Sequence, residues 1–156
     1  MNSKLKTEIE IDKIVSQAKI EKKKILFTNG CFDIVHLGHL ELLREAKEMS
    51  DIVIVGLNDD NYLTKYKGHN RPINTLQYRI RYLELLPYVD YIVVFKTRTP
   101  LSLIKKIRPD ILVKGRGYNI KNIVGAKEVF SYGGKVYALD FNLDISTTKI
   151  IEKLTK

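Results

Sequence analysis

Two of the three histidines of the chain, His36 and His39, are three residues apart and flank Gly38. An apolar run precedes them, and residues 41–49 place apolar side chains at helical spacing, so the pair falls at the start of a helix. Residues three apart share one face of a helix, and a helix N-terminus offers free N–H groups and a positive dipole end to anions. The glycine permits close approach to the backbone. This pattern predicts a phosphate-binding site with both imidazoles beside the phosphate. A cap or a half-buried polar residue is the alternative for either histidine alone.

Three consecutive hydroxyl side chains, Ser146, Thr147 and Thr148, precede a second helical run that ends near Leu154. A single hydroxyl is sufficient to cap a helix N-terminus. Three of them indicate a phosphate cradle built from hydroxyl and N–H donors, with an ordinary cap as the alternative. The two predicted helix starts would then hold one phosphate chain from two sides.

Five continuous apolar runs bounded by turn residues are typical of buried parallel strands. Helical patterns separate several of them, which predicts an α/β fold: a Rossmann-like parallel five-stranded sheet flanked by helices, with right-handed crossovers. Ligands bind beyond the carboxyl ends of such strands, and Asn58 follows one run at that edge. The first run begins near residue 25, and the other four cover 51–57, 88–95, 111–113 and 135–139. The helical patterns that separate them cover 41–49, 75–86, 99–107 and 124–131.

The first 24 residues are polar and rich in lysine. A partial apolar stripe predicts a helix over residues 8–20 that packs on the outside of the domain or in a dimer interface. We therefore expect an N-terminal helical extension over 1–24 and the main domain over 25–156.

Composition limits the class of protein. At 156 residues a single domain with a substantial core is expected. The formal net charge of +9 suits phosphate-bearing ligands as well as nucleic acid, and the chain has no zinc-finger spacing or interleaved basic and aromatic strand motif. The lack of nucleic-acid motifs makes a nucleic-acid partner the weaker interpretation. No apolar run reaches membrane-spanning length, so no membrane partner is expected. The single cysteine excludes an internal disulfide and fits a cytoplasmic protein.

Two further segments carry charge toward the predicted ligand edge. The polar stretch 62–71 is expected to be a loop, and Lys67, next to Gly68, is its better candidate for closing over a ligand; an ordinary mobile surface loop is the alternative. The stretch 114–118 supplies Lys114 and Arg116 between glycines. It is not a dinucleotide fingerprint, because the position that would require a third glycine holds Ile120.

The stretch Thr-Asn-Gly-Cys-Phe-Asp at 28–33, followed by His-x-Gly-His and later by Ser-Thr-Thr at 146–148, resembles the nucleotidyltransferase superfamily. The first block and Arg-Pro-Asp-Ile-Leu-Val-Lys-Gly at 108–115 are similar to the adenylyltransferase domain of bacterial heptose-1-phosphate enzymes. The resemblance covers residues 27–154. It implies transfer of AMP from ATP to a sugar 1-phosphate such as heptose 1-phosphate, with release of pyrophosphate, Mg²⁺ carried with the nucleotide, and a homodimer or higher oligomer.

The resemblance also implies roles for individual residues. The catalytic residues it implies are His36, His39 and Lys67. No protein side chains are expected to form a separate binding site for the metal ion. Acceptor binding falls to Asp33, which is also a candidate for positioning an ion, and to Asn58 and Arg116. The residues expected to bind the nucleotide are Thr28, Asn29, Gly30, Cys31, Phe32, Gly38, Lys114, Gly115, Ser146, Thr147 and Thr148.

The chain departs from the family pattern in the stretch 114–118. The family usually has Lys-Gly-Gly-Asp-Tyr, whereas this chain has Lys-Gly-Arg-Gly-Tyr, so it loses a carboxylate and gains Arg116. The choice of base and acceptor is therefore open. The alternatives are a cytidylyltransferase acting on glycerol 3-phosphate or another small phosphate, and a nucleotide-binding sensor without catalysis. The related glycerol-3-phosphate family has Arg-Thr-Glu-Gly-Ile before Ser-Thr-Thr, and this chain lacks that Arg and Thr, which argues against CTP.

Overall fold

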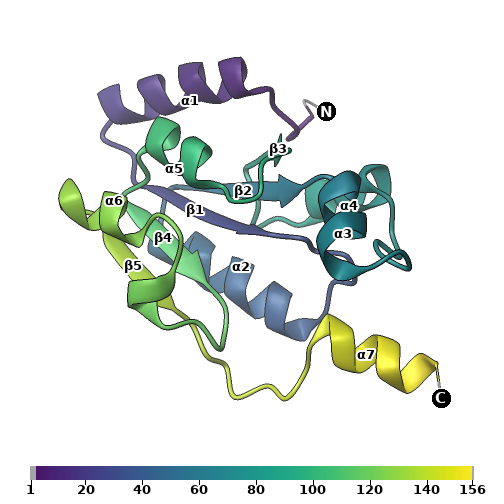
Figure 1. Cartoon of the computed structure of the whole chain (residues 1–156). Coiled ribbons are helices and arrows are strands. Elements are labelled where there is room, and N and C mark those ends of the chain that lie inside the picture. The colour runs from purple at the N-terminus through teal and green to yellow at the C-terminus, as the bar shows by residue number, and fades with distance from the viewer. Residues whose placement is uncertain (1–2, 156) are drawn as a thin grey trace.

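The computed structural model describes residues 3–155, and its centre is a five-stranded parallel sheet (Figure 1). The strand order is β3-β2-β1-β4-β5, with β1 in the middle. Consecutive strands are joined by helical crossovers, so all five carboxyl ends lie at one edge. This arrangement confirms the predicted fold class. The strands are β1 (Ile25–Gly30), β2 (Ile52–Asn58), β3 (Tyr91–Phe95), β4 (Ile111–Lys114) and β5 (Lys135–Ala138).

Helices cover both faces of this sheet and give the protein three layers (Figure 1). Their apolar side chains form two buried clusters with the strands, one on each face. On one face lie α1 (Glu8–Ile20), α5 (Leu101–Ile107) and α6 (Ala126–Ser131), and on the other α2 (Leu37–Met49) and α4 (Leu76–Leu85). Helix α3 (Asp60–Lys67) lies at the carboxyl edge. A short 3₁₀ turn, η1 (Ile120–Asn122), precedes α6. The last helix, α7 (Thr147–Leu154), follows the last strand.

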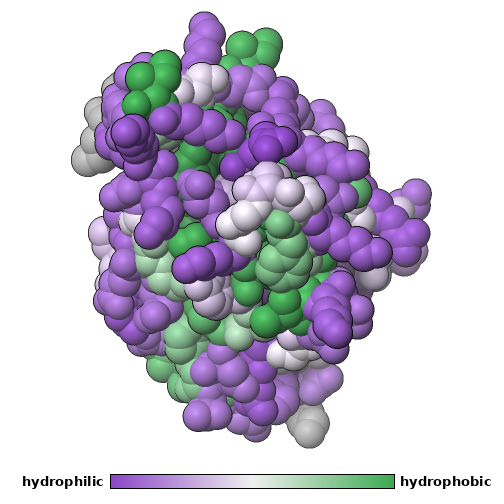
Figure 2. Space-filling view, turned by 90° about the vertical axis from the view of Figure 1, so that its left-hand side faces the viewer, coloured by the Kyte–Doolittle hydropathy of each residue, from purple (hydrophilic) through white to green (hydrophobic). Residues whose placement is uncertain are grey.

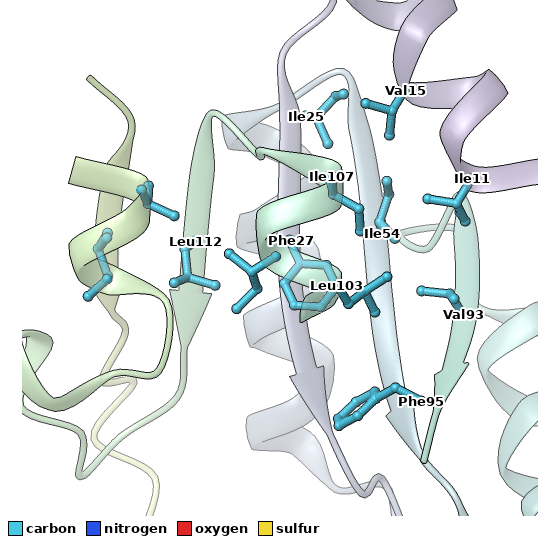
Figure 3. Packing of buried hydrophobic residues seen from close by; sticks show 14 of the residues in the cluster. Ile11, Val15, Ile25, Phe27, Ile54, Val93, Phe95, Leu103, Ile107 and Leu112 are labelled. Atoms are coloured by element: carbon cyan, nitrogen blue, oxygen red, sulfur yellow. The ribbon is translucent and has the colours of Figure 1, made fainter. Parts of the chain in front are cut away.

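The predicted N-terminal helix is present, but its surroundings differ from the expectation. Ile11, Val15 and Ala18 of α1 are buried in the same core cluster as Phe27 and Ile54 of the sheet (Figure 3). The chain before α1 also pairs with the sheet through a bridge between Leu5 and Ile92. The apolar stripe of α1 therefore packs against the sheet of its own chain rather than lying outside the domain. The division of the chain at residue 24 stays a prediction.

The segment 62–71, expected to be a loop, is helical over its first half. Helix α3 runs from Asp60 to Lys67, and Asp59 caps it by accepting a hydrogen bond from the Tyr62 amide at 2.9 Å. Leu63 is the single buried residue of this helix, so no apolar stripe was visible in the sequence. The cap and the following Asp60 are the local signals that the loop interpretation overlooked.

Hydrophilic side chains cover most of the face seen on the left of Figure 1, with apolar residues gathered mainly in its lower half (Figure 2). Across residues 3–155 there is no helix with the length and apolar character that a membrane span requires.

Candidate active site

A pocket of about 570 Å³ opens at the carboxyl edge of the sheet. Its walls come from the end of β1, the start of α2, the end of β2, helix α3, the turn before α5, the loop after β4 and the segment before α7. Segments far apart in sequence therefore meet at one place. This is the edge at which ligands bind in open α/β sheets.

Most residues that the sequence singled out line this pocket. Three do not: Asp33, Thr147 and Thr148. The predicted residues that the structure brings together are Thr28, Asn29, Gly30, Cys31, Phe32, His36, Gly38, His39, Asn58, Lys67, Lys114, Gly115, Arg116 and Ser146.

The two histidines form a packed pair at the start of α2. His36 is the N-cap residue, and its backbone N–H donates to His39 Nδ1 at 3.4 Å. The two ring centroids are 3.9 Å apart, and the Phe32 ring lies 4.9 Å from the His39 ring. A Cβ on Gly38 would come within 3.1 Å of the His36 ring, so only glycine leaves this packing undisturbed.

Both imidazoles are neutral at pH 7 in this arrangement. Burial, with a smaller contribution from His36, lowers the pKa of His39 to about 4, and burial also lowers the pKa of His36. Since His39 Nδ1 accepts a hydrogen bond, its proton is on Nε2, which is then the donor available to a ligand. The buried Nδ1 of His36 has no hydrogen-bond partner among the described residues. The pair thus offers polar nitrogen atoms to phosphate without two fixed positive charges.

A lysine ammonium reaches the pocket from β4. Lys114 Nζ donates to the backbone oxygen of Asn29 at 2.7 Å and to its side-chain oxygen at 3.1 Å. Desolvation lowers the pKa of Lys114 to about 8. The ammonium is therefore mostly charged at pH 7, but an anion bound beside it would stabilise the charge further.

Cys31 lies in the turn that follows β1, and its Sγ contacts the side-chain oxygen of Asn58 at 3.8 Å. Burial raises the pKa of the thiol, so it is protonated at neutral pH. A protonated thiol is a poor nucleophile, so this state does not favour a nucleophilic role for Cys31.

The Asp33 carboxylate is buried and fully engaged by the segment that precedes α4. It accepts hydrogen bonds from Arg71 Nε at 2.6 Å, the Ile73 amide at 3.0 Å and the Asn74 amide at 2.8 Å. These contacts fasten residues 71–74 to the turn between β1 and α2. These contacts give Asp33 a structural role in this structure. Its contact with an acceptor or an ion stays a prediction.

The three hydroxyls before α7 have different surroundings. Ser146 caps α7 by accepting from the Lys149 amide at 3.2 Å, and it also lines the pocket. Thr147 Oγ1 donates to the Ile34 carbonyl at 3.1 Å, which ties α7 to the turn before α2. Thr148 is exposed and lies outside the pocket lining. One hydroxyl, rather than three, faces the pocket in this structure.

Sequence reasoning missed several residues at the site. Tyr62, Arg98 and Asn122 line the pocket, and nothing in their local sequence distinguishes them from surface residues. Tyr118 also lines it, and its place at the end of the stretch 114–118 was the available signal. Arg79 is fully buried in α4 behind the pocket. It lies four residues before the buried Leu83 and so on the same helix face, which was the available signal.

Solved structures of other proteins share this fold. The lipopolysaccharide core biosynthesis protein from Thermoplasma volcanium GSS1 is similar with a TM-score of 0.60 and 22% sequence identity, over 76% of this chain and 95% of that one. Pantoate-beta-alanine ligase from Francisella tularensis is similar with a TM-score of 0.65 and 17% identity, over 97% of this chain and 76% of that one. At these identities the likeness concerns the fold alone.

Fold and pocket together define an α/β domain with a pocket at the carboxyl edge of its sheet. A sequence model of the cytidylyltransferase-like family matches residues 27–153, and the chain belongs to that family. It is 47% identical to the bifunctional protein HldE of Helicobacter hepaticus, over 99% of this chain and 32% of that protein. It is 45% identical to HldE of Alcanivorax borkumensis, over 90% of this chain and 29% of that protein. The chain thus spans about a third of the length of these relatives.

Proposed function

We propose that the protein is an adenylyltransferase that transfers AMP from ATP to a sugar 1-phosphate, heptose 1-phosphate in particular, and releases pyrophosphate. The observation that carries the proposal is the neutral His36–His39 pair at the N-terminus of α2, which shares one pocket with Lys67, Lys114 and Ser146. The identity with HldE over most of this chain and the cytidylyltransferase-like family to which it belongs support nucleotidyl transfer. The choice of acceptor rests on the resemblance of the blocks at 28–33 and 108–115 to the heptose-1-phosphate enzymes.

The proposed reaction is a direct in-line displacement. An oxygen of the acceptor phosphate attacks the α-phosphorus of ATP, the new P–O bond forms as the bond to the β-phosphate oxygen breaks, and pyrophosphate leaves. A phosphate nucleophile is already ionised at pH 7, so no strong general base is needed. The transition state requires positioning and stabilisation of charge on the phosphoryl oxygens.

The residues of the pocket supply those requirements in the proposal. His36 and His39 donate hydrogen bonds to phosphate oxygens, assisted by the backbone amides at the start of α2. Lys67, at the last turn of α3, holds the leaving pyrophosphate, and Ser146 holds the phosphates from the start of α7. Thr147 and Thr148 would join this cradle only after a rearrangement of α7, because neither lines the present pocket.

The nucleoside is proposed to lie along the end of β1. Residues 28–32 form its bed largely through backbone groups, and Lys114 and Gly115 border it from β4. Asn58 and Arg116 are proposed to contact the acceptor. Arg116 has room to do so, because its side chain is exposed and its partners, Asp140 at 3.5 Å and the Leu143 carbonyl at 3.4 Å, are held at long distances.

Mg²⁺ is proposed to enter with the nucleotide. Within the part of the chain that the structure describes, no group of three or more His, Cys, Asp or Glu side chains could hold a metal ion. The proposal gives the ion phosphate oxygens as ligands, where it neutralises charge on the triphosphate.

The test is pyrophosphate release by the purified protein with Mg²⁺. ATP and CTP are each combined with heptose 1-phosphate, glycerol 3-phosphate and flavin mononucleotide. Release with ATP and heptose 1-phosphate alone is expected. Release with another pair would keep the reaction class and move the substrate, with the stretch 114–118 the first place to look. ATP binding without release from any pair would contradict the proposed enzyme and favour a nucleotide sensor.

We also propose that the protein is a cytoplasmic homodimer or higher oligomer. Tyr78 and Leu85 lie two helical turns apart on α4 and are 67% and 69% exposed. Sedimentation of the wild type against a Tyr78→Ser, Leu85→Ser double variant tests this face. A change from dimer to monomer is expected, and a monomeric wild type would contradict the proposal.

A further inference from the structure

The largest fully buried side chain among the described residues belongs to Arg79 of α4. Its guanidinium reaches three separate pieces of backbone and side chain at the carboxyl edge of the sheet. Nη1 donates to the carbonyl of Cys31 at 2.7 Å and to the carbonyl of Asn58 at 2.8 Å, and Nη2 donates to Asp60 Oδ1 at 2.7 Å. A buried cation is costly unless such bonds satisfy it. The three bonds engage both terminal nitrogens, while the buried Nε has no hydrogen-bond partner among the described residues, so the position of the guanidinium depends on these three bonds.

One of these contacts holds the turn after β1, where Cys31 lines the pocket. The Cys31 carbonyl belongs to the peptide that leads into Phe32, whose backbone adopts the left-handed conformation at φ 47°. The Phe32 ring in turn lies 4.9 Å from the His39 ring. Fixing the Cys31 carbonyl therefore fixes the peptide that presents Phe32 to His39.

The remaining contacts hold the element that carries Lys67. Asn58 ends β2, and Asp60 begins α3, the helix that ends at Lys67. Asp60 is also bonded to α4 through the Leu76 amide at 3.0 Å. Arg79 thus ties the end of β2 and the start of α3 to the turn after β1, from behind the pocket wall.

We propose that Arg79 is the positioning residue of the phosphate site: by joining the turn after β1 to the start of α3, it holds His39 and Lys67 on the same pocket. It does not touch substrate and acts through Phe32 and α3. The kinetic part of this inference rests on the proposed adenylyltransferase function, whereas the structural part does not.

The test compares Arg79→Lys and Arg79→Met with the matched pair Arg81→Lys and Arg81→Met. Arg81 is on the same helix, but its side chain is 74% exposed and its one ion pair, with Glu84, is long at 3.7 Å. Two experiments are made: an NMR titration of the His39 ring, and steady-state kinetics that give kcat and KM for pyrophosphate release. Circular dichroism and the unfolding midpoint confirm that each variant is folded at the assay temperature.

We expect Arg79→Lys to lower kcat by about tenfold or more, since small displacements of catalytic groups are costly, with a smaller change in KM for ATP. Arg79→Met should lose more activity than Arg79→Lys, because it keeps no hydrogen-bond donor. In both variants the His39 titration should move up toward the ordinary histidine range as Phe32 loosens over the ring. His36 is the titratable neighbour that affects His39, and it is unchanged in all of these variants. The Arg81 variants should match the wild type in every measurement.

A folded Arg79→Lys or Arg79→Met protein with wild-type kcat and an unmoved His39 titration would overturn the inference. If neither variant folds, Asp60→Asn takes their place, because it weakens the bond to α3 and leaves both carbonyl contacts. It should lower kcat with an unmoved His39 titration, and wild-type kcat would overturn the inference. If the wild type releases no pyrophosphate with any acceptor, the proposed function fails, and the His39 titration alone still decides whether Arg79 positions the site.

Discussion

Individual side chains at the site depend on burial as much as on residue type. Both histidines would be mostly neutral at pH 7 even with the ordinary imidazole pKa, and their burial against each other and Phe32 lowers the pKa of each further. Neutral rings donate hydrogen bonds without repelling each other at 3.9 Å. We therefore expect their contribution to be directional hydrogen bonding that strengthens as charge develops in the transition state.

Replacing His36 by alanine should lower kcat by roughly 10²–10³-fold with the fold intact, the range found when one donor to a transition-state charge is removed. Steady-state pyrophosphate release measures this change. His69→Ala is the control, because His69 is exposed in the turn after α3 and does not line the pocket. Near-normal turnover in His36→Ala would remove His36 from the proposed mechanism.

Lys114 should make ATP binding weaken as the pH rises. Its pKa of about 8 in the free protein means that the ammonium loses its proton between pH 7 and pH 9, and with it the attraction for phosphate. If the charge is required, the affinity should fall about tenfold over this interval. Calorimetric titration of ATP at pH 7, 8 and 9 measures this affinity.

Two variants serve as controls. Lys114→Met should flatten the dependence of ATP affinity on pH, whereas Lys135→Met, at the far end of β5, should retain this dependence. A flat profile in the wild type would show that the Lys114 charge is not used.

At the scale of elements, the site is assembled by short segments that hold one another. The turn after β1 is fastened to residues 71–74 by Asp33 and to α7 by Thr147, while Asp59 and Asp60 organise the start of α3. These contacts are made between polar groups of neighbouring segments. Loss of one of them should therefore affect stability and site geometry together.

Asp33→Ala should lower the free energy of unfolding by about 3–5 kcal/mol, because it leaves the Arg71 guanidinium and two backbone amides without their partner. Urea unfolding gives this value. Asp144→Ala is the matched control: Asp144 also pairs with a cation, Lys149, but its side chain is 83% exposed, so little or no change in the free energy of unfolding is expected. Equal effects of the two substitutions would argue against a structural role for Asp33.

At the scale of the whole molecule, the N-terminal helix is part of the core. Ile11 is fully buried among residues of the sheet, and the chain before α1 extends the hydrogen bonding of β3. The first 24 residues therefore contribute to the stability of the layer that supports β1, β2 and their carboxyl ends.

Ile11→Ala should lower the free energy of unfolding by about 2–5 kcal/mol through lost burial and the cavity left behind. Ile9 lies on the same helix but is 69% exposed, so Ile9→Ala should change the free energy of unfolding by about 0.5 kcal/mol or less. Denaturant unfolding of the two variants measures the difference. A near-neutral Ile11→Ala would indicate that α1 docks without stabilising the domain.

The sequence by itself determined the sheet, most of the helices and the two helix starts that carry His36, His39 and Ser146. These features follow from local rules: the period of apolar residues, capping chemistry and the order of strand and helix. Most of the candidate residues, many of them named through the family resemblance, line one pocket, because parallel strands bring their carboxyl ends to one edge.

Only the tertiary structure decided how the site is held and charged. Arg79 resembles a solvent-exposed arginine in the sequence, and Asp33 resembles a ligand-binding carboxylate, until the partners of each side chain are known. The same holds for Tyr62 and Arg98, which reach the pocket from two different elements. The lowered pKa values of the histidines likewise depend on burial by Phe32 and by each other. Burial and long-range hydrogen bonds arise between residues distant in the chain, so no local pattern specifies them.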